Sequence, residues 1–199
     1  MTNHTHPTIF LYLLYALAAL CLFAGCAPAL HEVDAFYLDT SSPQPRVPEA
    51  QGKPLYLAPV TGYNSSLWYS DESGVWVLKR LPTAIVRDAL ILGMQSMRFE
   101  FVETPSESRA RLHAMVRWLA PYGHDPLTAV AIVSLALYSA DGMNLLWWGR
   151  IQAGRINRPA EILHGDQSNI LEEIFSSVLT RAVKQLRWNP ELRQALSIL

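Results

Sequence analysis

The two cysteines of this 199-residue chain could undergo chemical modification, and both lie close to the N-terminus. Cys21 falls in the apolar segment of residues 9–23, which contains no charged side chain. As a helix this segment would span roughly 22 Å, short of the ~30 Å hydrocarbon core of a bilayer. The small residues Ala24 and Gly25 follow it and directly precede Cys26. An apolar core of this length with a small-residue site behind it is typical of a cleaved signal peptide.

The sequence FAGC, which ends at Cys26, resembles the lipobox of bacterial lipoproteins. The resemblance implies cleavage before Cys26, a diacylglycerol group on its sulfur and an acyl chain on its new amino group. Several acyl chains make a stable membrane anchor, whereas a single chain binds only marginally. The alternatives are an ordinary cleaved signal and an uncleaved anchor in which Cys26 is a passive core residue.

Lipidation would leave the mature chain without a free thiol, because Cys21 is removed with the signal and Cys26 is modified. No disulfide, metal thiolate or cysteine nucleophile would then be possible. Ala27 stands where lipoproteins retained in the inner membrane typically have Asp. We therefore expect a lipid-anchored protein of the outer membrane that faces the periplasm.

The remaining residues with acid–base or metal-binding side chains do not combine into a catalytic or metal-binding motif. The adjacent carboxylates Glu172 and Glu173 would point about 100° apart on a helix, which does not suit a shared acid–base role. The histidines of the mature chain lack the spacing of a helical metal site; they are His31, His113, His124 and His164. The net charge of −1, with no long run of one sign, argues against a nucleic-acid partner. We expect no enzyme, no metal and no cofactor.

Two groups of side chains could bind a partner protein, because aromatic residues and arginine are enriched at the centres of interfaces. The first belongs to a predicted hairpin and comprises Tyr63, Trp68, Tyr69 and Trp76. The second is a row on one face of a predicted strand and comprises Arg109, Arg111 and Arg117. Each group also has a structural explanation, since a core needs aromatic residues and a solvated sheet face carries arginine.

Periodicity predicts the elements that position these side chains. In the strand of residues 109–120, the alternating positions from Ala110 to Trp118 are expected to face the core. Residues 189–190, Asn-Pro, predict the start of a short terminal helix. The other predicted elements are a strand at 55–60, a hairpin at 66–78, a helix at 78–97, a strand at 99–104, a hairpin around residues 141–142 and a helix at 170–186.

Two helices and a run of mostly consecutive strands predict an α+β fold. We expect a single mostly antiparallel sheet of about four to five strands, with two long helices packed on one face. Residues 40–54 contain four prolines and no periodic apolar positions, which predicts an extended tether. The predicted division is a lipoprotein signal peptide at 1–25, a lipidated N-terminus and Pro-rich tether at 26–53, and a periplasmic α+β domain at 54–199.

The order of motifs resembles that of the ABC-type transport auxiliary lipoproteins, including the paraquat-inducible, MCE-associated type. The matching stretches are FYL soon after the cysteine, PLYLAPV, and WYSDESGVWVL before LPTAIVRDALILGMQ. The segment DGMNLLWWG also resembles hairpins of other periplasmic α/β lipoproteins, such as the curli-secretion type and the activators of peptidoglycan synthases.

The first resemblance implies a non-enzymatic accessory subunit of an ABC/MCE-type intermembrane lipid transport system. Its partners would be the membrane, through the lipid anchor, and a component of the transporter. One alternative is a scaffold or activator of another envelope complex, for cell-wall synthesis or secretion. A second is a carrier that binds a lipid in a groove between helix and sheet. The sequence leaves the oligomeric state open.

Overall fold

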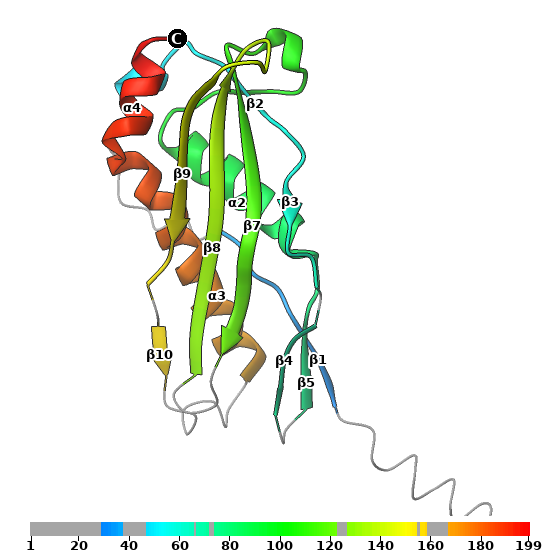
Figure 1. Cartoon of the computed structure of the whole chain (residues 1–199). Coiled ribbons are helices and arrows are strands. Elements are labelled where there is room, and N and C mark those ends of the chain that lie inside the picture. The colour runs from blue at the N-terminus through cyan, green and yellow to red at the C-terminus, as the bar shows by residue number, and fades with distance from the viewer. Residues whose placement is uncertain are drawn as a thin grey trace, which may run out of the picture.

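The computed structural model of the chain describes residues 29–37, 47–65, 67–71, 74–122, 127–154, 156–158 and 167–199. In this part of the chain, strands form one large and one small sheet, and α-helices cover one face of the large sheet (Figure 1). The elongated shape follows from strands β7 (Ala110–Tyr122) and β8 (Leu127–Ser139), each of 13 residues.

The large sheet is mixed and has seven strands. Strands β7, β8 and β9 (Leu145–Gln152) form an antiparallel centre, as the hairpin predicted around residues 141–142 requires. Parallel pairing enters through β2 (Leu55–Leu57), which lies between β7 and β6 (Phe101–Val102). Two short strands complete the sheet: β3 (Thr61–Gly62) pairs in parallel with β7, and β10 (Ile156–Arg158) pairs antiparallel with β8.

The small sheet has the order β1-β5-β4. Strands β4 (Leu67–Asp71) and β5 (Gly74–Leu78) form the predicted antiparallel hairpin. Strand β1 (Leu30–Val33) adds to it in parallel.

The prediction of a single mostly antiparallel sheet of about four to five strands with two long helices is therefore wrong. A strand of two to four residues, such as β1, β3 or β6, has too few positions for alternation to be recognised. Parallel partners also lie far apart in sequence, because a crossover must connect them. The segment from β2 through α2 to β6 is such a crossover.

Helices α2 (Pro82–Ser96) and α3 (Gln167–Lys184) pack against each other behind the large sheet, and α4 (Pro190–Ser197) lies beside β9 (Figure 1). The helix face and the inner sheet face meet in one core. Its fully buried members include Ile85, Leu90, Leu112, Leu137, Phe175 and Leu179. Three 3₁₀ turns complete the described elements: η1 (Pro48–Ala50), η2 (Pro105–Glu107) and η4 (Gln185–Trp188). Asn189 caps α4 as predicted, because its Oδ1 accepts the Leu192 N–H at 2.8 Å.

The segment that follows β1 is held between the two long helices. The Asp34 N–H donates to Glu172 Oε1 of α3 at 3.0 Å, and the Phe36 N–H donates to the buried Ser176 Oγ at 3.1 Å. Val33 and Ala35 are fully buried.

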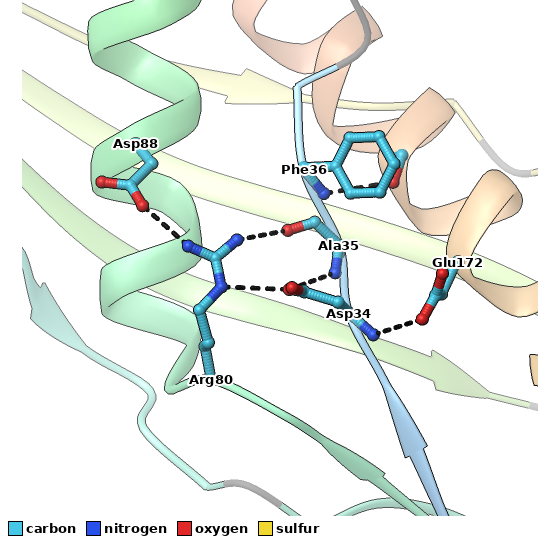
Figure 2. Close-up of polar contacts among 7 residues, drawn as sticks. Asp34, Ala35, Phe36, Arg80, Asp88 and Glu172 are labelled. Atoms are coloured by element: carbon cyan, nitrogen blue, oxygen red, sulfur yellow. Dashed lines mark hydrogen bonds and ion pairs between the residues drawn. The ribbon is translucent and has the colours of Figure 1, made fainter.

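Arg80, between β5 and α2, ties this segment to α2, as Figure 2 shows. Its Nε donates to Asp34 Oδ1 at 3.0 Å, and its Nη2 donates to the Ala35 carbonyl at 3.0 Å. The remaining nitrogen, Nη1, binds Asp88 Oδ2 of α2 at 2.7 Å. We call these four residues the Arg80 clasp.

The folded body thus includes residues that the sequence analysis places with the tether. Val33, Ala35, Tyr37, Val47 and Ala50 all belong to the core. Residues 38–46 lie outside the described part of the chain, as do the signal segment and Cys26.

We predict that Arg80→Ala lowers the free energy of unfolding by about 1–3 kcal/mol, because it removes three hydrogen bonds to partly buried groups. Faster hydrogen exchange at the amides of Asp34 and Phe36 should accompany the loss. The matched control is Arg87→Ala, since exposed Arg87 approaches the same Asp88 at 3.6 Å. That change should cost less than about 0.5 kcal/mol. Equal effects of both variants would contradict the special role of Arg80.

We also predict that Gly93→Ala in α2 destabilises the protein by about 1–3 kcal/mol, although alanine is the better helix former by about 1 kcal/mol. A Cβ at Gly93 would overlap Val183 Cγ1 of α3 and lie 2.8 Å from Tyr37 Cε2. Gly154→Ala is the control, because a Cβ there meets nothing within 4 Å and should change stability by less than about 0.5 kcal/mol. Urea unfolding of both variants checks this, and a stabilised Gly93→Ala protein would contradict the close packing of α2 and α3.

Candidate partner-binding surface

The large sheet turns one face away from the helices, and this face carries aromatic and cationic side chains. We call it the open face. Its residues near the middle of β7, β8 and β9 are Arg117, Trp118, Ile132, Ser134, Trp148 and Arg150. In Figure 1 this face is turned toward the viewer, with α2 and α3 behind the strands.

A β-bulge at Arg117 places Trp118 on the open face. Val116 pairs with Val133 and Trp118 pairs with Ile132, so Arg117 is an extra residue in β7. An extra residue reverses the alternation of the side chains beyond it. The expectation that Trp118 points to the core with Val116 is therefore wrong: Val116 is buried, whereas Trp118 is 40% exposed.

Strand β3 holds the bulge and the tryptophan in place. The Tyr63 N–H donates to the Val116 carbonyl at 2.8 Å, and the Tyr63 ring packs on the Trp118 ring with centroids 5.6 Å apart. Gly62 makes this approach possible, because its φ of +105° disfavours other residues and a Cβ would overlap the Val116 backbone.

Trp148 is the most exposed of the open-face tryptophans, at 69%. Its neighbour Trp147 is buried in the core, where its ring covers Gly149. Consecutive residues of a strand point to opposite faces, so a Trp-Trp pair in a strand with one buried face must present one ring to solvent. The sequence therefore contains the signal for Trp148, which the search for partner-binding residues missed.

A groove of about 1080 Å³ runs between this part of the sheet and the start of α4, where Asn189 and Glu191 complete its lining. Arg117 Nε donates to Ser134 Oγ at 3.1 Å on its floor. In the described part of the chain, no carboxylate lies within the 4.0 Å of an ion pair from Arg117 or Arg150. Exposed tryptophan rings next to arginines without carboxylate partners are typical of the centre of a protein interface.

The structure separates the residues that the sequence analysis groups in the aromatic hairpin. Trp76 is only 2% exposed and belongs to the core. Tyr63 is half-buried and supports Trp118 at the edge of the groove. Trp68 and Tyr69 lie in β4, and their side chains are outside the described part of the structure.

The three predicted arginines all lie on β7 or next to its start, but in different surroundings. Arg117 lines the groove, and Arg109 is exposed just before β7 begins. Arg111 is half-buried beside Gly142, in the turn between β8 and β9. The groove thus unites Arg117, which the sequence analysis selected as a partner-binding residue, with three residues that it did not select: Trp118, Trp148 and Arg150.

Three of the described side chains with acid–base capacity have structural partners: His113, Asp141 and Glu172. The His113 ring packs edge-on against Tyr138 at 5.0 Å, and Glu172 accepts the Asp34 N–H. The pKa of Asp141 is lowered by a hydrogen bond from the Ser139 hydroxyl and then by the Met143 N–H, which is the geometry of a closed turn. Among the described residues, no three His, Cys, Asp or Glu side chains gather as metal ligands. None of the described helices is long and apolar enough to cross a membrane.

The C-terminal wall of the groove is positioned by two polar contacts. The Gln185 side chain donates to the Gln152 carbonyl at 2.6 Å and accepts its N–H at 3.2 Å, which fixes η4 at the edge of β9. Arg193 of α4 binds Glu49 Oε1 of η1 through Nη2 at 2.7 Å and Nε at 3.1 Å. These hydrogen bonds from Arg193 lower the pKa of Glu49 below its usual value of 4.5.

No protein-family model matches the sequence, and no curated protein matches it. Among solved structures, the fold is similar to protein XCC0632 from Xanthomonas campestris, described with the family model DUF330. The TM-score is 0.56 at 14% identity, over 86% of this chain and 99% of that one. The hypothetical protein CT253 from Chlamydia trachomatis gives a TM-score of 0.51 at 7% identity, over 74% of this chain and 99% of that one.

A minor lipoprotein from Acinetobacter baumannii gives 0.46 at 9% identity, over 71% of this chain and 92% of that one, and this weaker likeness carries no argument. At these identities, the likeness to the Xanthomonas and Chlamydia proteins shows a shared fold and nothing about function.

We predict that the Glu49–Arg193 contact stabilises α4 at neutral pH and ceases to do so in acid. Because the pKa of Glu49 is lowered in the folded state, the contribution is fully present above the unfolded pKa of about 4.5 and is lost as the pH falls through the folded pKa. The urea midpoint of Glu49→Gln should therefore lie below that of the parent protein at about pH 7, and the gap should be smaller in acid, below the unfolded pKa.

Glu107→Gln at exposed η2 is the control for this titration, since no described partner binds the Glu107 side chain, and it should match the parent protein at both pH values. A gap for Glu49→Gln that persists unchanged in acid would contradict the assigned role of the carboxylate.

Proposed function

We propose that this chain is a bacterial lipoprotein, anchored through Cys26 in the outer membrane, whose periplasmic domain is a non-enzymatic accessory subunit of an ABC/MCE-type intermembrane lipid transport system. The domain binds a transporter component through the groove on the open face. The groove with Trp118 and Trp148 is the single observation on which the partner contact rests.

The anchor is supported by the sequence around Cys26, with its apolar segment and the FAGC motif. The transport assignment is supported by the resemblance of the motifs to auxiliary lipoproteins of such systems. The partner contact is supported by the fold, because a rigid sheet presents the groove and its tryptophans. Preorganised aromatic anchors lose little side-chain entropy on binding, which favours a specific complex.

The groove also favours binding over catalysis. Its polar groups are arginine, serine, asparagine and one exposed glutamate, Glu191. Among the described residues that line it, none forms the pair of nucleophile and base that covalent catalysis requires.

A second candidate function is that of a lipid carrier, and one observation favours it. A cavity of about 690 Å³ lies between α2 and the neighbouring strands β2 and β6. Its apolar lining includes Leu57, Val60, Ile91 and Phe101, with Arg87 and Glu103 also in the lining. A co-purifying lipid that is lost from an Ile91→Glu variant, while Trp148→Ala retains it, would support this function.

The partner contact is tested by crosslinking the membrane-anchored protein in its native host and identifying what is captured. We expect a transporter or MCE-domain protein to be recovered, and we expect the yield to fall with Trp148→Ala or Trp118→Ala. Truncation of a central tryptophan typically costs about 2 kcal/mol or more, which is roughly a 30-fold loss of affinity. Cys26→Ala should abolish recovery because the protein is no longer held at the membrane.

Met143→Ala is the matched control, because Met143 is apolar and even more exposed than the groove tryptophans but lies in the turn between β8 and β9. It should leave recovery unchanged. Recovery of cell-wall synthases or a secretion pore through the same tryptophans would overturn the transport role and support the scaffold alternative. A yield of the captured partner that neither tryptophan substitution changes would overturn the groove as the contact surface.

A further inference from the structure

We infer that the small sheet β1-β5-β4 is the end of the domain that rests on the lipid headgroups, with the paired starts of β1 and β5 next to the membrane surface. This inference rests on the proposed lipidation of Cys26. It goes beyond the proposed function because it fixes which end of the domain faces the bilayer and which surfaces remain free.

The argument starts from the short stretch of chain between the anchor and the first strand. The Val75 N–H donates to the Ala29 carbonyl at 2.8 Å, so the chain is already part of the sheet at residue 29. Three residue steps separate Cys26 from Ala29, and a fully extended chain covers at most about 11 Å in three steps. Neighbouring strands lie about 5 Å apart, which places Val75 within roughly 16 Å of the lipidated residue.

Strand β1 cannot move away from the hairpin without breaking the fold. It pairs with β5 over its whole length, from Leu30 opposite Val75 to Val33 opposite Leu78. At its far end the Lys79 N–H donates to the Val33 carbonyl at 2.8 Å. The Arg80 clasp then fixes the next two residues, Asp34 and Ala35, between the helices (Figure 2).

The tether that the sequence predicts would have allowed a different arrangement. A flexible chain of 28 residues, from 26 to 53, would have an r.m.s. reach of about 30 Å and would leave the orientation of the body free. In the structure, residues 29–37 belong to the body, so the unpaired connection after the anchor shrinks from that length to two residues at most.

The side chains at this end suit the headgroup layer. Leu30 is 66% exposed although it is apolar, and Val75 beside it is half-buried. Glu32 is exposed on β1. Charged side chains are costly in hydrocarbon, so this end of the small sheet would lie among the headgroups and not below them. The headgroup layer of one leaflet is about 5–7 Å thick, which the reach of the anchor covers.

The same geometry points the other end of the domain into the periplasm. The turn between β8 and β9 lies at the end of the long strands opposite to the small sheet (Figure 1). A 13-residue strand such as β8 spans about 44 Å, so Met143 in that turn would be held well away from the bilayer. The groove with Trp118 and Trp148 lies between the two ends and faces sideways.

The experiment places a fluorescent thiol label on the mature lipoprotein, which has no free cysteine of its own once Cys26 is acylated. Val75→Cys and, as a second position, Leu30→Cys report on the small sheet, and Met143→Cys is the distal control. Each lipidated protein is reconstituted into vesicles of phosphatidylethanolamine and phosphatidylglycerol that contain lipids with a headgroup nitroxide quencher. Mass spectrometry of the N-terminal peptide first establishes that Cys26 carries its acyl chains.

We expect the labels at Val75 and Leu30 to lose most of their fluorescence and the Met143 label to lose none. Insertion of about ten Gly and Ser residues between Pro28 and Ala29 should abolish the quenching at Val75, because the reach of the anchor then exceeds the range of the quencher. Quenching that survives this insertion would show that the short connection does not impose the contact, and would overturn the inference.

In protein whose acylation is verified, labels at Val75 and Leu30 that behave like the Met143 label would overturn the orientation while leaving the lipoprotein assignment intact. An unmodified Cys26 would instead overturn the proposed anchor, and this inference with it. The two failures are therefore distinguishable in one set of samples.

Discussion

The Arg80 guanidinium connects parts of the chain that no regular hydrogen-bond ladder joins. It binds the backbone and the side chain of the segment after β1, and it binds Asp88 on the first turns of α2. On the other side of that segment, α3 supplies Glu172 and the buried Ser176. An irregular segment can be buried only where its polar backbone groups find partners, and these side chains provide them. The union of the small sheet, the N-terminal segment and both long helices depends on this cluster.

Alternation of side chains separates the buried face of the large sheet from the open face, and a β-bulge interrupts this alternation in β7. Alternation buries Leu112, Leu137 and Trp147 under the helices and turns Trp148 outward. The bulge at Arg117 then reverses the alternation in β7 and adds Trp118 to the open face. Bulges are frequent next to functional sites because they re-aim a side chain without breaking the sheet. Here the bulge turns Trp118 to the open face, where it lines the same groove as Trp148, Arg117 and Arg150.

The proposed lipid anchor would set where these features lie relative to the membrane. A domain whose first strand begins within a few residues of a lipidated cysteine would keep a fixed orientation relative to the bilayer. Its groove would then meet a periplasmic partner at a defined distance from the membrane. Binding from such a restricted position raises the effective concentration of the partner without any additional contact. A rigid sheet, a preorganised groove and a short connection are consistent with a subunit that acts by contact.

The sequence by itself determined the features that depend on neighbouring residues. It predicted the hairpins around residues 72–73 and 141–142, helices α2 and α3 from their periodic apolar positions, and the Asn189 cap of α4 with Pro190 behind it. These are local properties, set by side-chain spacing within a few turns or by the chemistry of one turn.

The tertiary structure decided the features that need partners distant in sequence. Residues 30–33 have no strong strand pattern, and they become β1 because β5 offers a parallel edge and Arg80 binds the residues that follow. Trp118 faces outward because β3 and the Val116 carbonyl hold a bulge that alternation cannot reveal. Trp76 is buried because the small sheet packs against the body, although its hairpin alone would leave it exposed. In each case the deciding energy comes from long-range burial and pairing, which a local pattern does not contain.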